Sequence, residues 1–118
     1  MTVLIVDDEK TVRDGLKVII DWWDYGFDTI LEGEDGSDGV AKMIGFNPEL
    51  TLLDIRMPRM SGLEAAEQAR KAGYRGSIIM LSGYSDFKYA QSAIRFGVDA
   101  YLLKSIDENE LASAVQKV

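Results

Sequence analysis

Short apolar runs, each as long as one β-strand and each ended abruptly by a polar residue, constrain the fold of this chain most. Apolar runs without alternation are typical of strands that are covered on both faces, as in parallel sheets. Residues 27–32 alternate more weakly between apolar and polar, so we place that strand at a sheet edge. The unbroken runs are residues 3–6, 50–54, 77–82 and 100–103, and the polar residues at their ends are Asp7 and Asp8, Asp54, Ser82 and Lys104.

Between these runs the apolar residues follow a helical period, as in Val12, Leu16, Ile19 and Ile20. An aromatic-rich turn at residues 22–26 ends this first helix. A second helix is expected from Val40, Met43 and Ile44, and it is ended by Gly45 and Pro48. A third is expected from Leu63 and Ala66, begun by a Ser61–Glu64 capping box and ended by Gly73. A fourth is expected from Phe87, Ala90 and Ile94, begun at Ser85 and Asp86 and ended by Gly97, and a fifth from Leu111, Ala114, Val115 and Val118, begun at residues 107–110.

Five strands alternate with five helices, and this alternation predicts a doubly wound α/β fold. Right-handed crossovers then place helices on both faces of an open parallel sheet. At 118 residues the chain is expected to form one domain, residues 1–118. Because it stops on a helical pattern, we expect this domain to be cut from a longer protein.

The composition excludes several classes of function. A net charge of -7 and a pI near 4.5 argue against direct nucleic-acid binding, because phosphate contacts need a basic face. The absence of Cys and His excludes disulfides, thiol and histidine triads and the usual zinc sites. The apolar run at the N-terminus is too short for a signal peptide or a membrane span, so we expect a cytoplasmic protein.

The polar residues at the strand ends predict a metal site. The carboxyl ends of parallel strands meet at one edge of a sheet, where open α/β folds bind ligands. There the carboxylates of Asp7, Asp8 and Asp54 would repel one another unless a divalent cation lay between them. Mg²⁺ prefers such hard oxygen ligands, and no soft ligands stand at these strand ends to attract zinc or copper.

The same set of residues suits phosphoryl transfer to a carboxylate. With a metal in place, Asp54 can attack phosphorus and form an aspartyl phosphate. Lys104 and Ser82 would then neutralise and bind the phosphoryl oxygens. Each residue alone has an ordinary structural explanation: a helix cap, a turn residue or a solvent-facing lysine. Their joint occurrence at four strand ends favours the functional interpretation.

These residues closely resemble the receiver domain of bacterial two-component response regulators, and the resemblance covers essentially the whole chain. The resemblance implies a flavodoxin-like fold with strand order 2-1-3-4-5, an order known for this fold family rather than derived from the residues. The motifs that carry it are Asp7-Asp8, Asp54 followed by Met57-Pro58 and Gly62, Ser82-Gly83, Tyr101 and Lys104.

The resemblance also implies a role for each site residue. Asp54 would accept a phosphoryl group from a sensor histidine kinase, and Lys104 and Ser82 would hold its oxygens. Ser82 and Tyr101 would then move and repack the face formed by the fourth helix, the fifth strand and the fifth helix, which is also a possible homodimer surface. The implied Mg²⁺ ligands are Asp8, Asp54 and the backbone carbonyl of Arg56 directly, with Asp7 acting through water.

Three segments, residues 22–27, 52–58 and 82–87, resemble receivers that are fused to AraC-type DNA-binding regions. The full-length protein would then be a transcriptional regulator, although no DNA-binding segment lies within these residues.

One residue departs from the family pattern. The family usually has proline directly after the lysine, in a cis peptide bond, whereas this chain has Ser105 after Lys104. A non-proline cis bond costs about 2.5–4 kcal/mol, against roughly 0.5–1 kcal/mol before proline. Two hypotheses follow: the bond stays cis under strain, held by the contacts of Lys104, or it relaxes to trans, shifts Lys104 and weakens its coupling to Tyr101. We favour the trans form.

Three alternatives remain open at this point. A phosphatase of the haloacid dehalogenase type also uses an aspartyl nucleophile, but it carries Asp-x-Asp at the first strand and a cap domain. A flavodoxin-like flavin carrier needs a hydroxyl- and glycine-rich phosphate loop where this chain has Asp7, Asp8 and Glu9. A degenerate receiver that serves only as an interaction module is kept open by Ser105.

Overall fold

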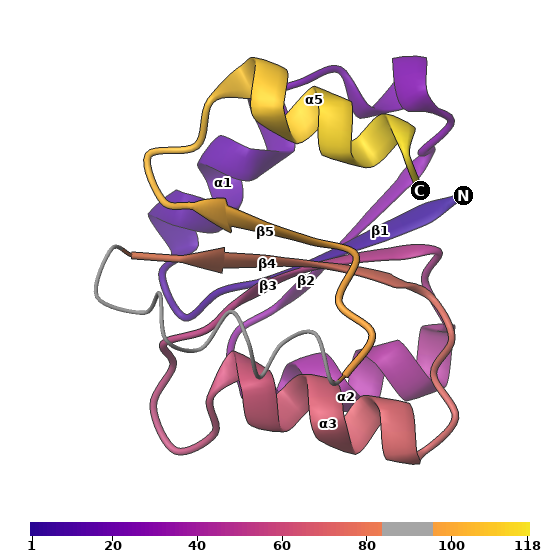
Figure 1. Ribbon diagram of the computed structural model, residues 1–118, viewed down its shortest axis with the longest axis vertical. Coiled ribbons are helices and arrows are strands. Elements are labelled where there is room, and N and C mark those ends of the chain that lie inside the picture. Colours follow the sequence, from indigo (N-terminus) through magenta and orange to yellow (C-terminus); the bar gives the residue numbers. More distant parts are fainter. Residues whose placement is uncertain (84–95) are drawn as a thin grey trace.

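The computed structural model of the protein describes residues 1–83 and 96–118 and contains one five-stranded parallel sheet. The strand order is β2-β1-β3-β4-β5, as predicted, so β2 lies at an edge (Figure 1). The strands are β1 (Thr2–Val6), β2 (Thr29–Gly33), β3 (Leu50–Asp54), β4 (Ser77–Ser82) and β5 (Ala100–Leu103). The described helices are α1 (Lys10–Val18), the 3-10 helix η1 (Trp22–Tyr25), α2 (Gly36–Phe46), α3 (Gly62–Lys71) and α5 (Glu108–Gln116).

Helices cover both faces of the sheet, which confirms the doubly wound fold. In Figure 1, α1 and α5 lie on one face, and α2 and α3 lie on the other. Neighbouring residues of β1 point to opposite faces, so that Ile5 packs in the core under α1 and α5 while Leu4 packs in the core under α2 and α3. This explains why β1 is an unbroken apolar run.

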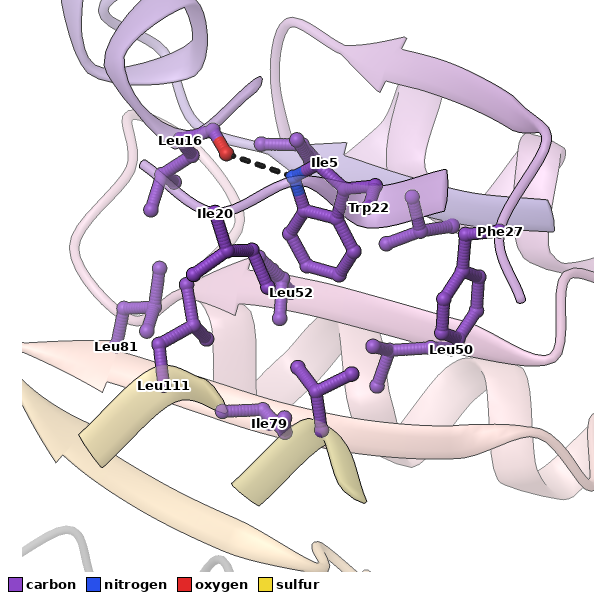
Figure 2. Close-up of a cluster of buried hydrophobic side chains, with 12 residues drawn as sticks. Ile5, Leu16, Ile20, Trp22, Phe27, Leu50, Leu52, Ile79, Leu81 and Leu111 are labelled. Atoms are coloured by element: carbon purple, nitrogen blue, oxygen red, sulfur yellow. Dashed lines mark hydrogen bonds between the residues drawn. The ribbon is translucent and has the colours of Figure 1, made fainter. Parts of the chain in front are cut away.

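The aromatic turn predicted at residues 22–26 is η1, and its contacts connect the end of α1 to the core (Figure 2). The buried Trp22 donates its indole N–H to the carbonyl of Leu16 at 2.9 Å. The Phe27 ring meets the Trp22 ring edge-on, with 5.6 Å between ring centroids, an arrangement that aromatic pairs favour. Gly26, with φ of 89°, ends η1 in the left-handed region that glycine adopts without strain.

The predicted ends of α3 and the predicted start of α5 are confirmed. The hydroxyl of Ser61 accepts from the backbone N–H of Glu64, whose carboxylate accepts from the backbone N–H of Ser61. Gly73, with φ of 100°, follows the last residues of α3. Asp107 caps α5 by accepting from the backbone N–H of Asn109.

Two expectations about α2 were wrong. Gly45 does not end α2, which continues to Phe46 and ends at Asn47 in the left-handed conformation. Ile44, predicted to face inward, is half exposed. The reason is that glycines set the rotation of α2: a Cβ at Gly39 would lie 2.9 Å from a methyl carbon of Val6. This close approach turns Met43 inward and leaves Ile44 outside.

Val118, expected on the inner face of the last helix, lies beyond the end of α5 and is exposed. The helix predicted from Phe87, Ala90 and Ile94, begun at Ser85 and Asp86, falls outside the described residues. Within the two described ranges, no helix combines the length and the apolar composition that crossing a membrane requires.

Candidate functional site

The carboxyl ends of the parallel strands lie along one edge of the sheet, at the left in Figure 1. This edge brings together residues that are far apart in the sequence. Asp7, Asp8 and Asp54 each have a carboxylate oxygen within 4.8 Å of those of the other two. Asp7 and Asp54 are buried, and Asp8 is exposed to solvent. The predicted convergence of these three carboxylates is therefore confirmed.

Lys104 reaches the same cluster from the end of β5. Its backbone N–H donates to the carbonyl of Ser82 at 2.6 Å, which extends the β4–β5 ladder by one residue. Its Nζ lies 3.3 Å from Oδ1 of Asp54 and 3.5 Å from Oδ2 of Asp7. The sheet register thus carries the ammonium group of Lys104 to both buried carboxylates.

Three oxygens of the two buried carboxylates lack hydrogen bonds within the described part of the chain. Among the described residues, neither oxygen of Asp54 has a hydrogen-bond partner, nor does Oδ2 of Asp7. Buried polar atoms are nearly always paired in folded proteins, so each exception needs an explanation. A cation bound between these oxygens supplies one, and the donor set of three carboxylates fits Mg²⁺.

Burial and, next, the neighbouring charge of Asp7 raise the pKa of Asp54 to about 6, against the opposing effect of Lys104. Burial also raises the pKa of Asp7. For Lys104, burial lowers the pKa, but the attraction of the Asp54 and Asp7 carboxylates outweighs it and the net pKa is raised. At neutral pH the site therefore holds costly negative charge next to a protonated lysine.

The loop after Asp54 is folded tightly against the backbone of this residue. A Cβ at Gly62 would lie 2.2 Å from the carbonyl oxygen of Asp54, so no larger residue fits there without a backbone shift. The Gly62 N–H donates to the carbonyl of Ile55 at 2.8 Å and closes the loop. Arg56 is an exposed residue of this loop, and the role of its backbone carbonyl as a metal ligand stays a prediction.

Ser82 and Tyr101 lie against each other. The Ser82 hydroxyl donates to the Tyr101 hydroxyl at 2.7 Å. Ser82 is buried, and the half-buried Tyr101 ring packs on the core under α2 and α3. The Tyr101 side chain therefore points inward in this structure, and the sequence alone does not predict which of its two orientations is adopted.

Ser105 adopts a left-handed conformation, with φ of 69°. The described residues contain no cis peptide bond, so the bond between Lys104 and Ser105 is trans, as predicted. Lys104 still reaches Asp54, and the expected displacement of this lysine is not observed.

One residue next to the site was missed. Arg13 is buried and donates to the backbone carbonyl of Asp7 at 2.7 Å. The helical pattern of Val12 and Leu16 predicts an inner face from apolar residues alone, and so it leaves out Arg13. Arg13 stands three residues before Leu16, and this spacing could have identified it as inward-facing.

Residues 3–116 match the family model described as the response regulator receiver domain. The chain belongs to this family. A receiver domain is a signalling switch rather than a turnover enzyme, so the family excludes the phosphatase and the flavin carrier considered above.

Two curated relatives are named as transcriptional regulatory proteins. HptR of Staphylococcus aureus is 41% identical over 109 residues, which are 92% of this chain and 42% of HptR. YesN of Bacillus subtilis is 32% identical over 116 residues, which are 98% of this chain and 32% of YesN. This chain therefore spans less than half the length of either relative.

Solved structures agree with the fold along the whole chain. The receiver domain of AraT from Geobacillus stearothermophilus has a TM-score of 0.90 and 37% identity, covering 98% of this chain and 90% of that one. A two-component transcriptional regulator AraC from Clostridium phytofermentans ISDg also has a TM-score of 0.90, with 39% identity, covering 99% of this chain and 91% of that one.

Proposed function

We propose that this receiver domain is a Mg²⁺-dependent phosphoacceptor in which Asp54 takes a phosphoryl group from a sensor histidine kinase. The observation that carries the proposal is the state of the Asp54 carboxylate. It is buried and has no hydrogen bond from any described residue, yet it lies within 4.8 Å of two other carboxylates and 3.3 Å from an ammonium group. Such an arrangement is costly in a resting protein and well suited to a reacting nucleophile.

In the proposed transfer, an Asp54 oxygen forms a bond to phosphorus while the bond from phosphorus to the donor's imidazole nitrogen breaks. The histidine side chain leaves with the electron pair of that bond. The ammonium of Lys104, already 3.3 Å from Asp54, neutralises charge on the transferred oxygens. Because little covalent chemistry is asked of the protein, positioning and charge supply the catalysis.

The residues that would hold the metal are Asp8, Asp54 and the backbone carbonyl of Arg56, with Asp7 acting through a water molecule. When bound, Mg²⁺ neutralises negative charge on the carboxylates and on the incoming phosphoryl group. Support for this set comes from the three clustered carboxylates and from their unpaired oxygens in the described part of the chain.

Ser82 and Tyr101 would transmit the change. Ser82 has one O–H and two lone pairs, so its hydroxyl can donate to a phosphoryl oxygen while it accepts from the Tyr101 hydroxyl. The present bond from Ser82 to Tyr101 would then reverse direction. Such a local charge change biases a two-state element, here the surface around β5 and α5, and the same surface is the proposed homodimer contact. The fourth helix, expected as the third part of this surface, lies outside the described residues.

The output of the full-length protein is proposed to be transcription regulation in the cytoplasm, through an attached DNA-binding region. The names of HptR, YesN and the Clostridium protein support this output. The acidic receiver itself would not contact DNA.

The test is the intact mass of the protein after incubation with Mg²⁺ and acetyl phosphate. We expect the wild type to gain one phosphoryl group, and we expect Asp54→Asn to gain none. Asp24→Asn is the matched control, because Asp24 is an exposed aspartate of η1, and it should behave like the wild type.

A chelator should prevent the gain in every variant, since the carboxylates need the metal beside them. A gain that persists in Asp54→Asn would place the acceptor elsewhere and contradict the proposal. If the wild type gained nothing from acetyl phosphate or phosphoramidate, a receiver that acts only as an interaction module would become the better description.

A further inference from the structure

A buried arginine lies directly behind the acidic cluster. Arg13, in α1, is 7% exposed. Its Nη1 donates to the backbone carbonyl of Asp7 at 2.7 Å, and its Nε donates to Oε1 of Glu32 at 3.0 Å. One side chain therefore joins α1, the end of β1 and β2. A hydrogen bond from a charged, buried donor is among the stronger ones in proteins.

Arg13 adds to a set of contacts that hold Asp7 at its N–H, its carbonyl and Oδ1, and leave Oδ2 with an ion pair only. The N–H of Asp7 donates to the carbonyl of Gly33 at 3.1 Å. Its Oδ1 accepts from the backbone N–H of Glu9 at 2.9 Å, and its Oδ2 lies 3.5 Å from Nζ of Lys104. The carbonyl held by Arg13 belongs to the peptide group that leads into Asp8, so its orientation sets the direction in which Asp8 leaves the sheet.

Glu32 keeps Arg13 in place. Besides Arg13, its carboxylate accepts from Nζ of Lys17 at 3.1 Å. Glu32 thus orients the planar guanidinium and balances its charge on the side away from Asp7. A lysine at position 13 could not reproduce the two-directional contact, because an ammonium lacks the rigid fork of the guanidinium.

We infer that Arg13 is a positioning residue for the metal site, acting through the carbonyl of Asp7 on the placement of the Asp7 and Asp8 carboxylates. The inference rests on the proposed function, since it concerns Mg²⁺ binding at that site. Residues that orient metal ligands typically change metal affinity by 10–100-fold when they are lost.

The sign of the effect separates positioning from charge. If Arg13 acted only through its charge, its removal would strengthen Mg²⁺ binding, because a nearby cation repels another. If Arg13 positions the ligands, its removal weakens binding in spite of that gain. The two roles of Arg13 thus predict opposite changes in Mg²⁺ affinity for the same substitution.

The experiment is calorimetric titration of the whole chain with Mg²⁺. We expect Arg13→Met to bind Mg²⁺ about tenfold more weakly than the wild type, and Arg13→Lys to restore little of the loss. Lys10→Met is the charge-matched control: Lys10 is an exposed residue of α1 that pairs with Asp14, and it should bind Mg²⁺ as tightly as the wild type or slightly more tightly.

A second background distinguishes positioning from a general loss of structure. With Asp8→Asn already present, adding Arg13→Met should weaken Mg²⁺ binding by less than it does in the wild type, since one of the two carboxylates that Arg13 positions is gone. A general structural role would weaken both backgrounds equally. If Arg13→Met fails to fold, Glu32→Gln is used instead. This variant keeps the Arg13 side chain but removes the carboxylate that orients its guanidinium, and we expect a fewfold loss of Mg²⁺ affinity.

Equal or tighter Mg²⁺ binding by Arg13→Met, with a wild type that binds, would overturn this inference alone. A wild type that binds no Mg²⁺ would overturn the metal dependence of the proposed function, and this inference with it. The two failures are therefore told apart by the wild-type titration.

Discussion

Strand β3 carries two buried polar residues, and they have opposite environments. The hydroxyl of Thr51 lies 2.9 Å from the hydroxyl of Tyr74, which donates to the carbonyl of Pro48 at 2.8 Å. Three residues further along, Asp54 has no hydrogen bond to either oxygen within the described residues. The same strand thus holds a satisfied polar group near its amino end and an unsatisfied one at its carboxyl end.

The two regions also use their cations differently. Arg70 donates to four backbone carbonyls at 2.7–2.9 Å, and its guanidinium lies 5.3 Å from the centroid of the Tyr74 ring. The ammonium of Lys104 instead forms ion pairs at 3.3 and 3.5 Å with the buried carboxylates. The accepting carbonyls are those of Tyr74, Gly76, Phe96 and Gly97.

The difference shows what each region is for. A fully paired polar cluster holds the fold together, because leaving any member alone exposes the cost of burying it. An unpaired set of carboxylates lowers the stability of the resting protein and keeps its oxygens free for a ligand. Substitutions in the two regions should therefore move stability in opposite directions.

The largest effect is expected from Arg70→Met. It removes four charge-assisted hydrogen bonds that tie the end of α3 to the start of β4 and to the turn before β5, and should lower the free energy of unfolding by about 3 kcal/mol. Urea unfolding followed by tryptophan fluorescence measures this change. Phosphorylation by acetyl phosphate should stay intact in the folded variant, since Arg70 makes none of the contacts described at the acidic site.

The control for this variant is Lys71→Met, which removes the same charge from the neighbouring residue. Lys71 makes an exposed ion pair with Glu67, so its loss should change stability by less than about 0.5 kcal/mol. An equal loss of stability in both variants would show that charge, rather than the carbonyl contacts, accounts for the effect of Arg70.

Asp54→Asn should have the opposite sign and stabilise the metal-free protein. The pKa of Asp54 is raised from 3.8 to about 6 in the folded state, so between these values the folded state binds more protons than the unfolded state. The free energy of unfolding therefore falls as pH rises through this window, by roughly 3 kcal/mol for two pKa units. Above the window the amide avoids this cost, and Asn should be more stable by about 2–3 kcal/mol.

Urea unfolding at pH 4.5 and pH 7.5 in the presence of a chelator tests this prediction. The wild type should lose stability across that range, and Asp54→Asn should lose less of it. A residual slope is expected from Asp7, whose pKa burial also raises. Added Mg²⁺ should stabilise the wild type at pH 7.5 by mass action. An asparagine variant less stable than the wild type at pH 7.5 would contradict the idea that Asp54 is held at a cost.

Tyr74→Phe is a smaller test of the paired region. Loss of the hydroxyl leaves Thr51 and the carbonyl of Pro48 without this partner, and we expect a decrease of about 1–2 kcal/mol in the free energy of unfolding. Tyr25→Phe, at a half-buried tyrosine of η1, is the matched control and should have a smaller effect. The Mg²⁺ affinity should stay unchanged in both. A change in metal affinity with Tyr74→Phe would mean that the two ends of β3 are coupled.

The same comparison explains which features the sequence could predict. β3, β4 and β5 were predicted with correct bounds. β3 and β4 are buried on both faces and so have unbroken apolar runs, and the half-buried β5 ends where Lys104 follows its apolar residues. The acidic cluster followed from the strand ends, since parallel strands place those ends on one edge. The orientation of Tyr101 could not be predicted, because its amphipathic ring suits both a buried and a solvent-facing rotamer.

Two arginines that donate to backbone carbonyls were missed for a different reason. Arg13 and Arg70 donate to backbone carbonyls, and Arg70 reaches one that is 26 residues away. Every residue carries a carbonyl, so no side-chain pattern marks the acceptor. The exposure of Ile44 was missed because a close contact between Gly39 and Val6 sets the rotation of α2, and a hydrophobic period does not record such a contact.

The smallest expected effect lies at Ser105. Among the described residues, the non-glycine positions with positive φ are Asn47, Arg59 and Ser105. Asn47 is near Pro48, at the paired end of β3, and asparagine tolerates the left-handed conformation. Arg59 and Ser105 lie beside the acidic site, where this conformation costs more for an ordinary side chain. Backbone strain, like unpaired charge, is therefore concentrated at the functional edge.

Ser105→Gly should relieve this strain and raise the free energy of unfolding by about 0.5 kcal/mol, the difference between the relief and the greater freedom of glycine in the unfolded chain. Ser105→Ala is the control, because it removes the same hydroxyl but keeps the Cβ, and urea unfolding compares the two. A glycine variant no more stable than the alanine variant would show that the backbone after Lys104 carries no strain. The contrast between the two ends of β3 would then rest on the unpaired carboxylates alone.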